Sequence, residues 1–157
     1  MDMTKNKFLS FLIFGAITYS ASIIGGLTTY YSKEPWYTTL NKPFFNPPDW
    51  IFAPVWTILY FFMTIAIWLI WQSPKKENKI IFLYLLHLII NTTWSIIFFT
   101  FHSIIGALIV LLLLITFIII LILNFRKINF ISFYLMIPYL LWCFFALILN
   151  LSLFILN

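Results

Sequence analysis

The chain has 157 residues, of which 64% are apolar and 22% aromatic. Only 8% are charged, against roughly 25% in a soluble domain, which excludes a soluble enzyme, a nucleic-acid-binding domain and a disordered segment. The composition predicts an integral membrane protein. In such a protein a pI near 9.4 indicates basic cytoplasmic loops, and we expect no nucleic-acid partner.

The charged residues delimit the membrane spans. The uncharged stretches are 8–32, 50–74, 80–125 and 128–157. About 20 apolar residues cross the hydrocarbon as a helix, so the third stretch must hold two spans, and polar residues at 100–103 predict its break. Aliphatic runs such as 111–115 exclude a membrane β-barrel. We therefore predict an all-α fold, an integral membrane five-helix transmembrane bundle in one domain, with helices at about 8–30, 51–71, 80–100, 104–124 and 130–154 and an outer loop at 32–50.

The basic residues are distributed unequally over the two sides of this bundle. Of nine Lys and Arg residues, the first loop holds only Lys33 and Lys42, and the other seven fall on the opposite side. The positive-inside rule then predicts the amino terminus inside and the carboxy terminus outside, in a bacterial inner membrane.

The first loop combines prolines with aromatic residues. Four prolines in residues 35–48 restrict φ, so we expect a stiff segment. Either Trp36, Tyr37 and Trp50 form an interfacial aromatic belt, or the loop is a lid that closes a cavity between the helices.

The second and third predicted helices each carry a stripe at helical spacing. The stripes are Trp56, Tyr60, Met63 and Ile67, then His87, Asn91, Trp94, Ser95 and Phe98. The first is typical of helix packing. Polar groups in the second either join helices by hydrogen bonds or orient a ligand. Because His87 has no second ligand at metal spacing, we expect a hydrogen-bonding residue and no metal site.

The last two predicted helices differ in character. The fourth is almost entirely aliphatic, which is typical of a scaffold facing lipid or another subunit. One face of the fifth carries Tyr139, Trp142, Ala146 and Asn150. A bulky ring beside a small residue and an amide suits a flat apolar ligand, and it equally suits small-residue helix packing. No span contains Asp, Glu, Lys or Arg, which excludes the usual ion-coupled or acid–base site.

Three groups of these residues form one pattern along the chain. They are Trp36-Tyr37, Leu40, Lys42-Pro43, Pro47-Pro48 and residues 52–60 with Met63; then Asn91, Trp94-Ser95 and Phe98-Phe99; and then residues 138–140, Trp142, Phe145-Ala146 and Leu149-Asn150. In order and spacing, the pattern resembles the signature of the TspO/MBR family, the tryptophan-rich sensory proteins and the mitochondrial translocator protein.

The resemblance implies a five-helix bundle, commonly a homodimer, with a pocket at the outer-loop end for porphyrins, haem, or isoquinoline and benzodiazepine-type ligands. Matching positions place Tyr37 in the lid and six residues in the pocket walls: Trp56, Tyr60, Asn91, Phe98, Trp142 and Ala146. We expect His87, which stands where many relatives carry Gln or Asn, to join Asn91 in hydrogen-bonding the polar edges of the ligand. The carboxy end lacks the Tyr and basic residue of the proposed cholesterol motif, so sterol binding by that route is not expected.

The leading hypothesis is a membrane receptor or binding protein for porphyrins and haem-like tetrapyrroles, with no cofactor beyond that ligand. Two alternatives stay open. One is a light- and oxygen-dependent porphyrin-degrading enzyme, with Trp56 and Trp142 as the candidate redox residues. The other is a tetrapyrrole or lipid transporter.

Overall fold

The computed structural model describes residues 6–157, and over that range it contains helices and loops but no strand. Asp2 and Lys5, which belong to the amino-terminal charge group, lie outside the described residues. The helices are α1 (Lys7–Ser32), α2 (Trp36–Thr39), α3 (Asp49–Gln72), α4 (Asn78–Ser95), the π-helical turn η1 (Ile96–Thr100), α5 (Ile104–Ile128) and α6 (Phe130–Leu156). Within the described chain, five helices are long and apolar enough to cross a membrane, with η1 completing α4. The predicted multi-pass all-α membrane bundle is confirmed.

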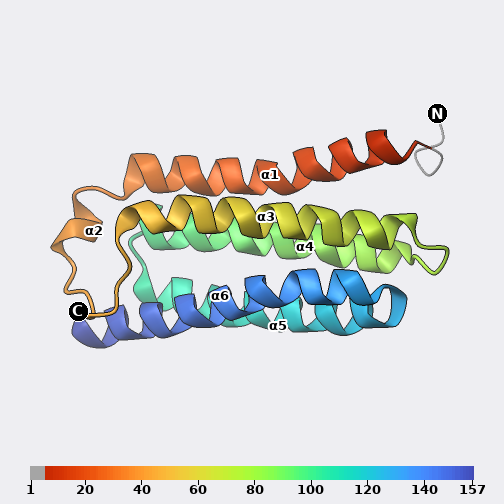
Figure 1. Cartoon of the computed structure of the whole chain (residues 1–157). Helices are drawn as coiled ribbons and strands as arrows, with labels where there is room; N and C mark the ends of the chain where they lie inside the picture. Colours follow the sequence, from red (N-terminus) through yellow and green to blue (C-terminus); the bar gives the residue numbers. More distant parts are fainter. Residues whose placement is uncertain (1–5) are drawn as a thin grey trace.

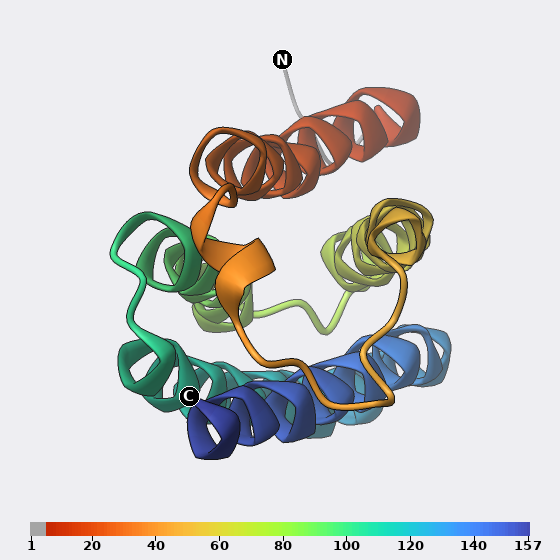
Figure 2. The same ribbon diagram turned by 90° about the vertical axis from the view of Figure 1, so that its left-hand side faces the viewer.

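The five long helices form a ring. The most extensive contacts run in the order α1, α3, α6, α5, α4 and back to α1, and α3 and α4 also contact each other. Figure 1 shows α1 on one side of the bundle, α5 and α6 on the other, and α3 and α4 between them. The view along the bundle in Figure 2 shows α2 and its flanking loops crossing one end of the ring. The ring encloses an interior that α2 faces.

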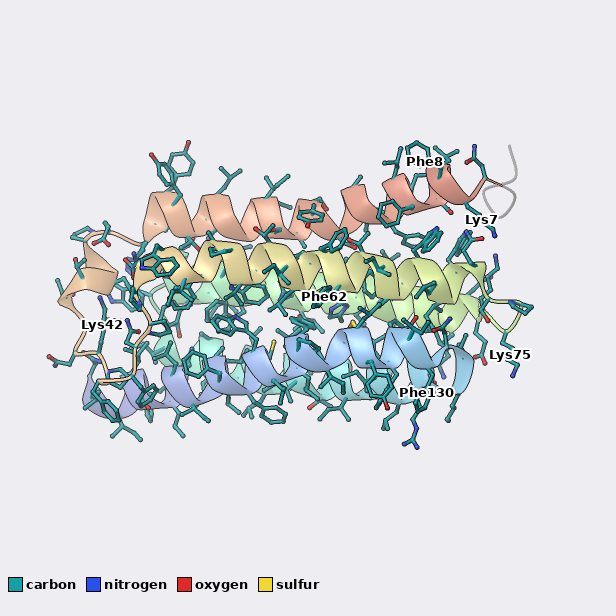
Figure 3. The ribbon with its side chains drawn as sticks, viewed as in Figure 1. Lys7, Phe8, Lys42, Phe62, Lys75 and Phe130 are labelled. Carbon is teal, nitrogen blue, oxygen red and sulfur yellow. The ribbon has the colours of Figure 1, made fainter. Side chains whose placement is uncertain are left out.

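The two ends of the bundle differ in charge. The carboxy end of α6 and α2 lie together at one end, with Lys42 near them (Figures 1 and 3). Lys33 lies at the end of α1, three residues before α2. Lys7 and Lys75 lie at the opposite end, which also holds the α3–α4 and α5–α6 connections. The remaining described basic residues lie in these connections or in the helix turns beside them: Lys76, Lys79, Arg126 and Lys127.

The break predicted at 100–103 is confirmed. His102 has a φ of +52°, and the Ser103 side chain accepts a hydrogen bond of 3.1 Å from the Gly106 backbone N–H at the start of α5. A serine in this position satisfies one of the N–H groups that a helix leaves unpaired at its first turn. The chain therefore leaves the membrane and re-enters it with only a few residues of turn.

The helix boundaries differ from the prediction mainly at α5, which extends to Ile128 where we expected an end at 124. Arg126 and Lys127 lie in its last turn, where a positive charge is favourable to the helix dipole. The Arg126 guanidinium also lies 5.8 Å from the centre of the Phe133 ring in α6. Helical structure therefore continues past the end of the apolar run.

Helix α5 has two distinct faces, although its sequence is uniformly aliphatic. Leu114, Ile118 and Leu121 are buried in the core, whereas Ile109 and Leu112 are exposed on the outside of the bundle. The expectation that this helix serves only as an outer scaffold is therefore incomplete. One face of α5 forms a large part of the core against α6.

Candidate functional site

A cavity of about 640 Å³ lies inside the ring at the end crossed by α2. Residues of α1, α2, α3, α4, η1 and α6 line it, together with Lys33 and Glu34 of the connection between α1 and α2, and no described residue of α5 does so. The volume is within the range of ordinary ligand pockets. The enclosed ring interior is therefore filled by side chains at one end and open at the other.

Tyr37 of α2 covers part of the cavity at its outer end. Its side chain is 5% exposed, and its ring lies 6.2 Å from that of Phe98 and 5.9 Å from that of Phe99. The hydroxyl donates a hydrogen bond of 3.2 Å to Asn46 Oδ1, and the Lys42 ammonium lies 4.2 Å from the ring centre. Burial, assisted by the negative charge of Asp49, raises the pKa of Tyr37, so the hydroxyl stays protonated. Tyr37 thus lies in the position expected of a lid, while Trp50 remains exposed as a belt residue would.

Trp36 fastens the lid to the α4–α5 connection. Its indole stacks on the His102 ring at 4.5 Å and meets Phe98 edge-on at 5.2 Å. Aromatic pairs of this kind stabilise by about 0.5–1.5 kcal/mol beyond their buried area. The short helix α2 thus contributes the Tyr37 ring to the cavity and the Trp36 ring to the contact with the α4–α5 connection.

Three charged residues surround the mouth of the cavity. The Lys33 ammonium, at the end of α1, pairs with the Asp49 carboxylate at the start of α3 and lies 3.8 Å from Glu34. The carboxylate side chains are more than half exposed, so each pair adds little stability. The charge at this site is therefore confined to the entrance.

Aromatic rings cover two walls of the cavity. On the α3 and α6 side, the ring centres of Trp56 and Tyr60 lie 5.5 Å apart, and those of Trp142 and Phe52 lie 6.0 Å apart. On the α4 and η1 side, Trp94 stacks on Phe98 at 5.5 Å with an interplanar angle of 13°. Ala146, a small residue one turn beyond Trp142, leaves room between the walls. The arrangement is suited to a flat apolar ligand.

The cavity floor is a chain of hydrogen bonds across three helices. The Tyr60 hydroxyl donates to Asn91 Oδ1 at 2.5 Å, and Asn91 Nδ2 donates to the Tyr139 hydroxyl at 2.9 Å. Tyr60 is 4% exposed and Tyr139 is fully buried. The Asn91 amide therefore already has a partner for its oxygen and for its nitrogen.

Comparison with known proteins identifies the family of this chain. The model of the TspO/MBR family matches residues 13–156. The chain belongs to the TspO/MBR family. It is 38% identical over 125 residues to the tryptophan-rich protein TspO of Chlorobaculum tepidum, covering 78% of this chain and 79% of the relative. A protein of the same name from Archaeoglobus fulgidus is 33% identical over 135 residues, or 85% and 87% of the two chains. The translocator protein of Bos taurus is 37% identical over 82 residues, about half of each chain.

In this TspO/MBR protein, seven of the eight predicted site residues line the cavity: Tyr37, Trp56, Tyr60, Asn91, Phe98, Trp142 and Ala146. His87 does not. It lies on α4 one turn before Asn91 in the chain, and the centre of its ring is 5.8 Å from that of Tyr139. Its Nδ1 is 2.6 Å from the Tyr84 carbonyl oxygen, and the side chain is fully buried. The expectation that His87 hydrogen-bonds a ligand edge is corrected, because neither His87 nor the neighbouring Tyr139 lines the cavity.

No group of three metal-ligating side chains occurs among residues 6–157. Cys143 is buried and unpaired, as a small apolar residue in a helix core would be. The candidate site of this family member is thus a set of aromatic and amide side chains.

The first helix of this family member supplies a wall that the sequence analysis missed. Ser22, Gly25, Gly26 and Thr29 of α1 line the cavity. A Cβ atom at Gly25 would lie 3.2 Å from Ser95 Oγ of α4, which is a tight approach. The adjacent glycines in a span were the available signal, because small residues let helices approach closely.

Proposed function

We propose that this protein is a membrane receptor that binds porphyrins and haem-like tetrapyrroles in the cavity beneath α2. The observation that carries the proposal is a cavity of about 640 Å³ with aromatic rings on two walls and a tyrosine lid. A flat conjugated ligand gains both buried apolar area and ring stacking in such a space. Family membership supports the same ligand class.

The charge distribution agrees with an amphipathic ligand of this kind. The apolar walls are uncharged, whereas Lys33, Glu34 and Asp49 surround the mouth. The carboxylate groups of a porphyrin can reach the entrance while its macrocycle lies between the walls. Binding of this kind requires no catalytic acid, base or metal from the protein.

Titration with protoporphyrin IX in detergent, followed by the change in the porphyrin absorbance band, tests the proposal. The wild-type protein should bind it saturably at one site per chain. Ala146→Phe should weaken binding at least tenfold, because the added ring occupies space between the walls. The matched control is Ala16→Phe, since Ala16 is exposed on α1 and does not line the cavity. Equal affinities for the two variants would contradict the proposed site.

A second candidate function is light- and oxygen-dependent degradation of the bound porphyrin. The observation in its favour is that Trp56 and Trp142, two oxidisable side chains, both line the cavity. Under illumination in air, loss of porphyrin absorbance should then be faster with protein than in micelles alone. Trp142→Phe should slow it, whereas Trp50→Phe, on an exposed side chain outside the cavity, should not. An equal loss of absorbance with both variants would exclude this role for Trp142.

The proposal includes the orientation in a bacterial inner membrane. Six described basic residues lie at the end opposite α2 and two at the α2 end. The positive-inside rule then favours the α2 end, with the cavity mouth, on the outer face. Labelling of Lys42→Cys, in a Cys143→Ala background, by a membrane-impermeant maleimide in intact cells tests this. Labelling only after lysis would reverse the orientation.

The same proposal includes a homodimer and leaves transport as a further alternative. Light scattering in detergent of known micelle mass should give twice the chain mass. Proteoliposomes that accumulate labelled porphyrin inside would favour a transporter over a receptor that binds without moving its ligand.

A further inference from the structure

Asn150 of α6 is a buried amide without a hydrogen-bond partner among residues 6–157. The residue is 2% exposed and lines the cavity, and neither its Oδ1 nor its Nδ2 bonds to any of these residues. A buried amide without hydrogen bonds is costly, so native structures rarely keep one without a reason. Asn150 therefore offers one acceptor and two donor hydrogens to whatever enters the cavity.

Asn150 differs from the other buried polar residues in its lack of a hydrogen bond. Seven buried polar side chains occur among residues 6–157, and the other six each make at least one side-chain hydrogen bond. Asn91, which also lines the cavity, has both amide groups engaged by Tyr60 and Tyr139. The amide that is free to bind a ligand is therefore that of Asn150.

Trp94 adds a second free donor to the same cavity. Its Nε1–H is buried and bonds to no residue of the described chain, while its ring stacks on Phe98. Trp94 packs with Phe98 against a cluster that includes Leu153, which follows Asn150 by about one helical turn. Two other unpartnered buried ring nitrogens, in Trp71 and His87, belong to residues that do not line the cavity.

The charge around Asn150 restricts what it can bind. All charged residues on the cavity wall lie at the mouth, and α6 has none. An ionised carboxylate beside Asn150 would lose its hydration without gaining a cation, which is unfavourable. A neutral group that places a carbonyl acceptor next to an N–H or O–H donor matches the Asn150 amide with two hydrogen bonds.

We propose that Asn150 and Trp94 form a polar subsite that recognises a neutral carboxamide, lactam or carboxylic-acid edge of the ligand. In this subsite Asn150 Oδ1 accepts from the ligand donor, and Asn150 Nδ2 and Trp94 Nε1 donate to its carbonyl. The subsite rests on the proposed function, because the aromatic walls position the ring system whose edge it reads. It makes Asn150 a specificity-determining residue, in the place that the sequence analysis gave to His87 and Asn91.

Two probes that differ only in this edge test the subsite. They are the bis-amide and the dimethyl ester of protoporphyrin IX, in which the propionate edge is uncharged and can enter the cavity instead of staying at the charged mouth. The bis-amide carries a donor and an acceptor on this edge, whereas the ester carries the acceptor alone. An unmatched buried acceptor costs enough to separate two ligands by about tenfold. The wild-type protein should therefore bind the bis-amide about tenfold more tightly than the ester.

Asn150→Leu, which keeps the side-chain size, should remove this preference. The matched control is Asn124→Leu, because Asn124 of α5 does not line the cavity and bonds only to the Ile120 carbonyl of its own helix. The control should keep the tenfold preference. Trp94→Phe should weaken both probes by a similar factor, since both carry the acceptor that its N–H would contact.

The outcomes separate the two proposals. A preference that persists in Asn150→Leu, or equal affinities for both probes in the wild-type protein, overturns the subsite and leaves the tetrapyrrole receptor standing. Failure of the wild-type protein to bind either probe or protoporphyrin IX overturns the receptor itself. Thermal unfolding without ligand gives an independent measurement, in which Asn150→Leu should be at least as stable as the wild-type protein. A clear loss of stability would mean that the amide has a structural partner and would also overturn the subsite.

Discussion

The hydrogen bonds of the cavity floor allow a quantitative test. Asn91→Leu removes two interhelical bonds, of 2.5 Å to Tyr60 and 2.9 Å to Tyr139, and leaves both hydroxyls buried. Orphaned buried groups in water-soluble proteins cost about 1–3 kcal/mol each. Interhelical hydrogen bonds within membranes average only about 0.6 kcal/mol, with a maximum near 1.7. Since these residues are in a membrane bundle, we expect a loss of about 1–3 kcal/mol for the pair.

Cys143 provides the assay for this prediction. It is the single cysteine of the chain and is buried, so a thiol-reactive fluorogenic dye reports unfolding as the thiol becomes accessible. Asn91→Leu should unfold at a lower temperature than the wild-type protein. The triple variant that adds Tyr60→Phe and Tyr139→Phe should recover part of the loss, because no hydroxyl remains unpaired.

The comparison of these two variants decides the matter. If the triple variant is less stable than Asn91→Leu alone, something other than the amide stabilises the two tyrosine hydroxyls. That result would refute the role given to the Asn91 hydrogen bonds. Thr92→Val is the matched control on α4, since the Thr92 hydroxyl bonds only to the Leu88 carbonyl of its own helix. It should unfold close to the wild-type temperature.

Two further predictions concern the cap and the lid. Ser103→Ala removes the side-chain cap of α5 and should lower stability by about 1 kcal/mol in the thiol assay, whereas Ser103→Asn, which restores a capping oxygen, should recover most of it. Burial raises the pKa of Tyr37, so closure of the lid should be constant below pH about 10, the ordinary tyrosine pKa, and weaken as pH rises further. Porphyrin dissociation should therefore accelerate above that pH in the wild-type protein, and less so in Tyr37→Phe. Identical alkaline profiles would contradict the role of this hydroxyl.

Several features of the site followed directly from the sequence. Tyr37, Trp56 and Trp142 were predicted in the walls and lid, and all line the cavity. Helical spacing predicts which residues share a face, and the paired prolines predict a stiff loop. A short helix within that loop and the π-helical turn after α4 were not predicted, because both depend on packing of Trp36, Tyr37 and Phe98 against one another.

The hydrogen-bonding state of each amide could not be predicted from the sequence. Asn91 and Asn150 look alike in a sequence, since both are lone amides in apolar helices. Asn91 has two tyrosine hydroxyls within reach, whereas Asn150 has none. That difference depends on which helices meet at each level of the bundle. The same holds for His87, which lies on the predicted face but one turn too deep.

The sequence by itself determined the number of spans, their approximate limits and the turn at His102 and Ser103, because hydropathy, charge and capping act between residues near one another in the chain. It also placed the basic residues on two sides. Only the tertiary structure decided which face of α5 is buried, because its aliphatic run has no periodically spaced polar residues to mark a face. It also decided the closed ring of helices around the cavity. Those properties arise from contacts between distant segments, and no local pattern encodes them.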